Sequence, residues 1–244
     1  MFSILKRNHI DVFCYTNSVT AYERFPISKA RQFIPRWWKD IPNNVYSSGS
    51  AYESSANTVV TMKRCPGIIE LYKRGFMMPL WTDIEFIIHN STYSFMAADR
   101  KTNAESHPSI QMGEFLSSGN WSHAKLVSPW LIETKTNLEF LCMQPHWNLN
   151  ELNKDIMIPN GHVTFNRGNH SANAQMFVNT TVNTTINMSA GTPLMHFVPL
   201  TDKKIKVHAI YDPDRCNILY EKGSLYSFGS IFYRKRKDPL HNNL

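Results

Sequence analysis

The sequence predicts a mainly β protein, a two-layer antiparallel β-sandwich or jelly roll with two short helices. Between about residues 124 and 212, short segments rich in β-branched and aromatic residues recur, with turn signals such as Pro159-Asn160-Gly161 between them. A hydrophobic fraction of 42% is enough for a packed core, and a charged fraction of 18% is too low for general disorder. Helical periodicity is confined to two short stretches in the first third of the chain.

A single β-rich domain is predicted over residues 1–225, followed by a basic and aromatic C-terminal arm over residues 226–244. All-β sandwiches and barrels often reach 244 residues as one unit. The sequence contains no internal repeat and no linker long enough to separate two domains.

The first short helix is predicted near residues 28–38. Ser28 can cap it, Pro35 interrupts it, and Trp37 and Trp38 lie at the spacing of a core-facing helical stripe. We therefore expect both tryptophans to be buried, together with two others, Trp81 and Trp130, which lie in apolar segments further along the chain.

The second short helix is predicted near residues 66–74. Pro66 suits the first helical turn, and Gly75 suits the position just after the last turn. The apolar residues between them fall on one helical face, which we expect to pack on the β-sheets.

Two hairpins are predicted from alternating segments joined by turn residues. The first turns at His89-Asn90, between residues 82–88 and the stretch that ends at Ala97. The second turns at Lys135-Thr136-Asn137, between a strand at residues 130–134 and a strand at residues 138–143.

Four cysteines are far apart in the sequence, and none has the spacing of a zinc or redox motif. The N-terminus lacks the apolar stretch of a secretory signal, and no apolar run approaches the ~20 residues that a membrane-spanning helix needs. We therefore expect free thiols and no export through a signal peptide.

The net charge is +7 and the pI about 9.2, a balance that favours an anionic partner: nucleic acid, an anionic surface or an acidic protein. Two basic runs contribute, Lys203-Lys204-Ile205-Lys206 and a C-terminal run that we predict to be an interaction site. Basic residues also alternate with aromatic ones between Arg24 and Lys39, a pattern that single-strand nucleic-acid binders use. The C-terminal interaction residues are Arg234, Lys235, Arg236 and Lys237.

Four of the ten histidines are candidates for a metal cluster in the mouth of a jelly roll, where imidazoles from neighbouring strands bind a divalent metal. They are His146, His162, His170 and His196. A different metal motif, His-x-Asp, occurs at His9-Ile10-Asp11, which precedes the strands where such motifs lie. Ordinary surface or hydrogen-bonded histidines are the competing interpretation.

Signatures of catalysis are otherwise missing from the sequence. It contains no Gly-x-Ser-x-Gly motif, no Walker A loop and no Gly-x-Gly-x-x-Gly loop. The carboxylates Asp83 and Glu85 share one strand face, but a surface pair is the simpler explanation.

Five short motifs stand out between about residues 20 and 210. They are Phe33-Ile34-Pro35-x-Trp37-Trp38-Lys39, Cys65-Pro66-Gly67, Gly75-Phe76-x-x-Pro79-Leu80-Trp81-x-Asp83, Ser128-Pro129-Trp130-x-Ile132 and Gly191-Thr192-Pro193-Leu194-x-x-Phe197-x-Pro199. Together they resemble an uncharacterised family of β-sandwich or jelly-roll proteins encoded by tailed phages, marine cyanophages among them, and by some bacteria. The resemblance covers roughly residues 20–210 and implies no catalytic residues.

The resemblance and the missing catalytic motifs favour a non-enzymatic phage-type protein, either virion-associated or an interaction module inside the host cytoplasm. Its partners would be protein subunits, including copies of itself, with nucleic acid left open and no membrane. It would need no cofactor. The alternative is a metal-dependent, cupin-like enzyme that acts on a small molecule and requires a divalent metal.

Overall fold

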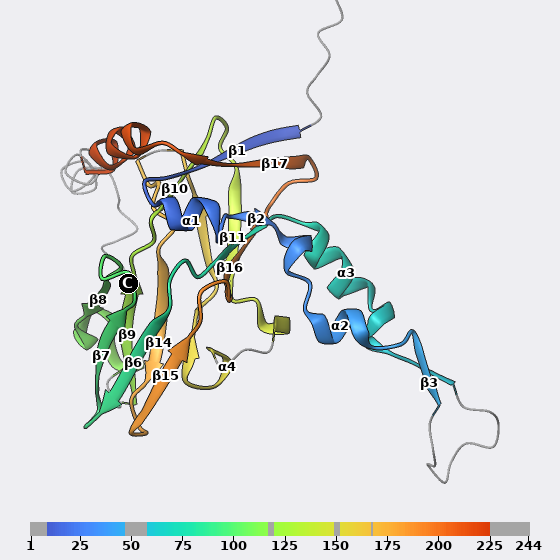
Figure 1. Cartoon of the computed structure of the whole chain (residues 1–244), viewed down its shortest axis with the longest axis horizontal. Helices are drawn as coiled ribbons and strands as arrows, with labels where there is room; N and C mark the ends of the chain where they lie inside the picture. Colours follow the sequence, from blue (N-terminus) through green and yellow to red (C-terminus); the bar gives the residue numbers. More distant parts are fainter. Residues whose placement is uncertain (1–8, 47–57, 117–119, 149–151, 167, 225–244) are drawn as a thin grey trace, which may run out of the picture.

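The computed structural model describes residues 9–46, 58–116, 120–148, 152–166 and 168–224, which form four larger β-sheets and a two-stranded ribbon. Sheets that bury one face each must pack on another element, and the four larger sheets share one hydrophobic core. Figure 1 shows how the strands are arranged. The mainly β fold class, consistent with a β-sandwich, is therefore confirmed.

The first sheet has the order β10-β1-β17, and the second has the order β13-β11-β16-β5-β2. In the first, β1 pairs with β10 in the antiparallel sense but with β17 in parallel. This parallel pair brings together the first and last strands of the described part of the chain. The strand bounds are β1 (His9–Thr16), β10 (Trp130–Thr134), β17 (Lys204–Tyr211), β2 (Ser28–Lys29), β5 (Phe76–Pro79), β11 (Glu139–Met143), β13 (Gly161–Thr164) and β16 (Pro193–Pro199).

The third sheet has the order β12-β14-β9-β8, and the fourth has the order β15-β6-β7. All pairs in both are antiparallel. Figure 1 shows β6, β7 and β15 in front of β9 and β14. The bounds are β6 (Ile84–His89), β7 (Thr92–Ala97), β8 (Ala104–His107), β9 (Trp121–Leu126), β12 (Ile156–Met157), β14 (Ala174–Asn179) and β15 (Thr184–Met188).

One hydrophobic core contains residues from all four of these sheets. It includes Val12 and Trp130 from the first sheet and Phe76 from the second, all 0% exposed. Met176 and Phe86, also fully buried, add the third and fourth sheets. Burial of so much apolar surface is the main favourable contribution to the stability of this fold.

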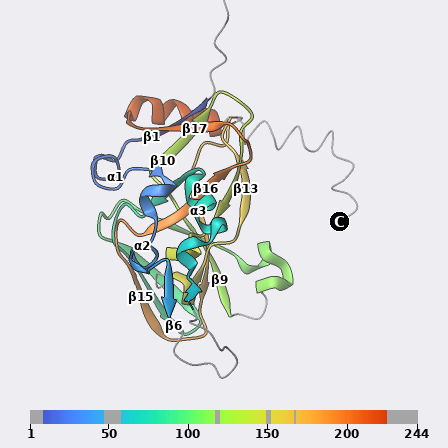
Figure 2. The same cartoon turned by 90° about the vertical axis from the view of Figure 1, so that its right-hand side faces the viewer.

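The remaining segments between residues 28 and 75 lie beside the sheets, and Figure 2 turns this side toward the viewer. We call residues 28–46 and 58–75 the lateral region. Its ribbon pairs β3 (Asn44–Tyr46) with β4 (Thr58–Val60). Its helical elements are η1 (Ala30–Phe33), α2 (Arg36–Asp40), η2 (Met62–Arg64) and α3 (Pro66–Lys73).

Other helical elements connect strands or follow the last one. A helix at residues 213–224 packs on the first sheet through Cys216 and Leu219, which contact Leu131. Within the described residues, none of the helices is long and apolar enough to cross a membrane. The connecting elements are α1 (Val19–Glu23), η3 (Ser109–Leu116), η4 (His146–Asn148) and α4 (Leu152–Asp155).

Both predicted helices are present in the structure. Pro35 divides the first into η1 and α2, and Pro66 and Gly75 bracket α3 as the sequence indicates. The expected burial holds for Trp81 and Trp130 but not for the tryptophans of α2, which are only half-buried. Those two belong to the lateral region and are not part of the main core.

The first predicted hairpin is confirmed: β6 and β7 pair across a two-residue turn at Asn90 and Ser91, whose φ angles are 51° and 60°. Positive φ at both central residues is the geometry of a type I′ turn. The second predicted hairpin is wrong, because β10 pairs with β1 and β11 pairs with β13 and β16. The Thr136 carbonyl accepts hydrogen bonds from the Thr134 hydroxyl (2.9 Å) and the Leu138 amide (2.8 Å), and this tight turn sends the chain into a different sheet.

Candidate functional site

The four histidines predicted as metal ligands lie at different places in the second sheet and around it. His162 on β13 pairs with Leu141, and His196 on β16 pairs with Met143, so β11 lies between their two strands. His146 is exposed in η4, and His170 is buried beside β10. Among the residues that the structure describes, no group of three or more His, Cys, Asp or Glu is placed to hold a metal ion.

In two of these histidines, a ring nitrogen forms a hydrogen bond with a backbone carbonyl. Nδ1 of His170 lies 3.0 Å from the Ile132 carbonyl oxygen, and Nε2 of His196 lies 2.9 Å from that of Arg74. Burial lowers the pKa of His196, which favours its neutral form, while the bond to Arg74 opposes this shift. His162 is exposed, 3.4 Å from Glu139. The histidine-metal hypothesis therefore has no geometric support in these residues.

The His-x-Asp motif at the start of β1 does meet a distant histidine, which sequence reasoning missed. Oδ1 of Asp11 lies 2.8 Å from Nε2 of His208 on β17 and 3.7 Å from Nε2 of His9. Only the parallel pairing of β1 with β17 reveals this contact. The three side chains are 23–41% exposed and are not among the groups placed to hold a metal.

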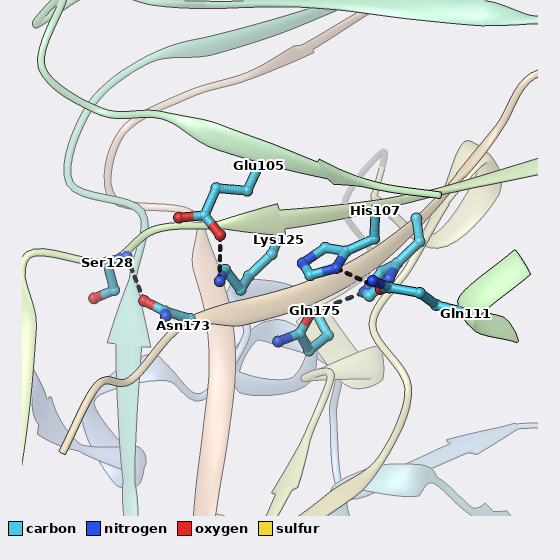
Figure 3. A network of polar contacts seen from close by, with 8 residues as sticks. Glu105, His107, Gln111, Lys125, Ser128, Asn173 and Gln175 are labelled. Atoms are coloured by element: carbon cyan, nitrogen blue, oxygen red, sulfur yellow. Dashed lines mark hydrogen bonds and ion pairs between the residues drawn. The ribbon is translucent and has the colours of Figure 1, made fainter. Parts of the chain in front are cut away.

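A second polar network lies along β8, β9 and β14 (Figure 3). The rings of His107 and His123 stack with centroids 4.6 Å apart. Nδ1 of His107 lies 2.8 Å from Gln111 Oε1, and Nε2 of His123 lies 2.8 Å from Gln175 Oε1. The remaining ring nitrogens, Nε2 of His107 and Nδ1 of His123, are buried and have no hydrogen-bond partner in the described structure.

Charges in this network are paired. Lys125 on β9 forms an ion pair with Glu105 on β8, directly across the strand pair. Burial lowers the pKa of His123, the Gln175 bond opposes the shift, and the nearby His107 and Lys125 lower it further. The network ties three strands together and presents no free charge to a ligand.

A cleft of about 720 Å³ lies between α1, the turn before β8 and the helix at residues 213–224, and several of its polar groups bond to one another. Asp99 accepts hydrogen bonds from the Lys101 and Thr102 amides and from the Thr102 hydroxyl. That hydroxyl in turn accepts from Nε1 of Trp81 at 2.7 Å. These bonds shape the wall of the cleft and do not point to a ligand.

Six cationic side chains line a different cleft of about 310 Å³, where the lateral region meets the turn between β16 and β17. We call it the basic cleft. Asp202 is its one acidic lining residue among those described. The cations are Lys29, Arg31, Lys73, Arg74, Lys203 and Lys204.

Three segments far apart in the sequence bring these cations together. β2 pairs with the start of β5, which sets Lys29 opposite Phe76. The Ala30 amide then donates to the Gly75 carbonyl at 3.2 Å, so η1 starts beside the end of α3. Cations at the C-terminal end of a helix interact favourably with its dipole, which suits Lys73.

Gly75 makes the close approach to the third segment possible. Its φ of +72° lies in the left-handed region, and a Cβ at this position would collide with the Phe197 carbonyl oxygen. β16 therefore runs directly against the end of α3. The turn that follows β16 then carries Lys203 to the cleft, and β17 begins there with Lys204.

Little opposing charge is present in the basic cleft. Lys73 pairs with Glu70 at 2.8 Å, on α3 itself. For the other five cations, no ion pair occurs among the described residues. The lining contains no histidine and no cysteine, so the cleft offers attraction for anions and no evident acid–base or nucleophilic chemistry.

Sequence reasoning found part of this site. The basic runs at residues 203–206 and 24–39 stand out in the sequence, but nothing in it indicates that they meet. The C-terminal interaction run, Arg234, Lys235, Arg236 and Lys237, lies outside the described residues, as does the whole arm at 226–244. All four cysteines are free, as expected from the sequence.

Comparison of the chain with models of known protein families, with curated proteins and with solved structures found no significant match. The basic cleft is therefore interpreted from its own chemistry.

Proposed function

We propose that this chain is a non-enzymatic interaction protein of the tailed-phage type, virion-associated or acting in the host cytoplasm, which docks on an anionic partner through the basic cleft. The phage assignment rests on the resemblance of five sequence motifs. The docking function rests on the cluster of unpaired cations.

The unpaired cations carry this proposal. Five cationic side chains without ion pairs in the described structure share one cleft with a single carboxylate. Like charges held together repel one another, and an anionic ligand relieves that repulsion while it gains attraction from each cation. A surface that served only solubility would spread such charges apart.

The β3–β4 ribbon favours a protein as the partner. All six of its residues are exposed, including Tyr46 at 85% and Val60 at 57%. Exposed apolar side chains gathered on a protruding element are typical of surfaces that contact another protein. The ribbon belongs to the same lateral region as half of the basic cleft.

A polyanion-binding measurement tests the proposed function. Fluorescein-labelled poly-L-glutamate is titrated with the protein, and anisotropy gives the affinity at several salt concentrations. The double variant Lys203→Glu/Lys204→Glu should bind at least about tenfold more weakly, because two attractions become repulsions. Binding by the wild type should weaken as salt rises, since salt screens exposed charges.

Lys222→Glu is the matched control, because Lys222 is an exposed lysine that does not line the basic cleft. It changes the net charge but not the cleft. Equal binding by the double variant and the wild type would contradict the proposal. An equal loss per charge in the control would show that net charge alone attracts the polymer.

A further inference from the structure

An apolar pocket of about 300 Å³ adjoins the basic cleft, and the two share Arg31 and Lys73 as lining residues. The pocket lies between η1, α2 and α3. Its apolar lining consists of Ile34, Trp38, Ile68, Ile69 and Tyr72. A ligand that spans the shared rim would therefore meet an apolar surface on one side and cations on the other.

The pocket suits an aliphatic side chain better than a nucleobase. Stacking of a base needs an accessible aromatic face. Tyr72 is only 2% exposed and its hydroxyl donates to Asn148 Oδ1 at 2.7 Å. The ammonium group of Lys63 lies 5.3 Å from the centroid of the Trp38 ring and occupies one side of it. Isoleucine side chains supply most of the remaining lining.

We propose that the occupant is an acidic segment of another protein, with one leucine-like side chain in the apolar pocket and flanking carboxylates in the basic cleft. This inference rests on the proposed function and names the class of partner. The charge pattern and the apolar pocket together define the ligand: neither a purely acidic chain nor a purely apolar one would use both.

The partner is a different protein, not a second copy or a distant part of this chain. No two acidic residues are adjacent anywhere in the sequence. The terminal stretches carry the wrong charge, since residues 1–8 contain two cations and no acid. Residues 225–244 contain four cations and one acid, Asp238. A cationic cleft would repel both ends.

A pair of labelled peptides tests the inference with the full-length chain. One has the sequence Gly-Glu-Glu-Leu-Glu-Glu-Gly, and the other has serine in place of leucine. Anisotropy should show that the wild type prefers the leucine peptide by about tenfold, the ratio expected for partial burial of one leucine side chain. A labelled single-stranded dT oligonucleotide of about the same charge is titrated alongside.

Two variants locate the preference. Ile69→Ser should reduce it to about one while the serine peptide binds as before, and Ile110→Ser should leave it unchanged, because Ile110 is 86% exposed and remote from the pocket lining. The charge-reversed variant Lys203→Glu should weaken binding of both peptides equally. Circular dichroism checks that each variant is folded. The preference of the wild type for the leucine peptide can be measured even if a variant does not fold.

The outcomes separate the two proposals. If the wild type binds both peptides equally well and Lys203→Glu weakens both, the anionic docking function stands and the apolar anchor is overturned. If the oligonucleotide binds more tightly than the leucine peptide, a nucleic acid replaces the acidic protein segment as the partner. If Lys203→Glu weakens neither peptide, the proposed function itself fails.

Discussion

Several charged side chains outside the basic cleft are paired with partners on neighbouring elements, whereas five of the six cations of the cleft have no ion pair among the described residues. Arg215 donates to both carboxylate oxygens of Glu133 at 2.6 Å and so joins the C-terminal helix to β10. Lys125 pairs with Glu105 across two strands. Paired charges reinforce a fold, and unpaired ones are available to a ligand. The contrast distinguishes charges that stabilise the fold from charges that are available to a ligand, although Lys29 and Lys204 of the cleft themselves lie on strands.

The sheets are also packed more extensively than the lateral region. The main core includes tryptophan and phenylalanine side chains with no exposed surface, such as Trp130 and Phe76. The lateral region has a small core of its own, built on Ala30, Ile68 and Tyr72. Its fourth buried member, Met77, comes from β5 of the second sheet. The lateral region therefore depends on the sheets for its stability, and the sheets do not depend on it to the same degree.

Replacing a tryptophan in each region gives the largest expected difference. Trp130→Ala should destabilise the protein by roughly 3–5 kcal/mol, because it leaves a large cavity in the main core. Trp37→Ala, at a half-buried side chain of the lateral region, should cost much less. Urea denaturation measures both. Similar losses for the two variants would show that the regions are not packed differently.

Gly75, which joins the two regions, gives the next largest effect. Gly75→Ala should cost roughly 2–3 kcal/mol, because the left-handed backbone strain adds to a collision with the Phe197 carbonyl. Gly161→Ala is the control: nothing lies within 4 Å of the added Cβ and its φ is not in the left-handed region, so only a small change is expected. Thermal denaturation compares them. Equal effects would mean that β16 does not lie against the end of α3.

Acid should destabilise the sheets through two buried histidines. Burial lowers the pKa of His123 and of His196 in the folded protein. Their neutral forms are therefore favoured, and the stability that they contribute is present above the unfolded pKa of about 6.5 and lost as the pH falls through the folded value. The urea concentration at the unfolding midpoint should therefore decrease when the pH is lowered from 7.5 to 5.

His196→Gln tests the assignment of this effect. The glutamine amide can still donate a hydrogen bond to the Arg74 carbonyl, but it does not titrate, so the midpoint should depend less on pH. His162→Gln, at an exposed histidine, should keep the wild-type dependence. A midpoint that rises as the pH falls would contradict the direction of both shifts.

Sequence reasoning recovered what local residues determine. The helix between Pro66 and Gly75 and the turn at Asn90 follow from backbone preferences within a few positions. It failed at Lys135-Thr136-Asn137, where a turn signal joins two sheets instead of two paired strands. Which strands pair is decided by packing over the whole chain, and nothing near β1 indicates that its parallel neighbour is β17.

The candidate site could be predicted only in fragments for the same reason. Lys29 and Lys203 are separated by more than 170 positions in the sequence, and each lies in a basic run that can equally be a solvated surface. The histidine hypothesis lacks geometric support among the described residues, and residue type alone does not show that a ring nitrogen is bonded to a backbone carbonyl, as it is in His196.

The smallest expected effect is a gain in stability from removing unpaired charges. Arg31→Gln/Lys203→Gln should raise the melting temperature by about 1 °C at low salt, because two repulsive cations leave the basic cleft. The gain should disappear in about 1 M NaCl, where screening acts within about 3 Å. Lys125→Gln should do the opposite and lower the melting temperature, since it removes a paired cation from the sheets. If both substitutions lowered the melting temperature alike, the cations of the cleft would be structural, and the comparison on which its binding role rests would fail.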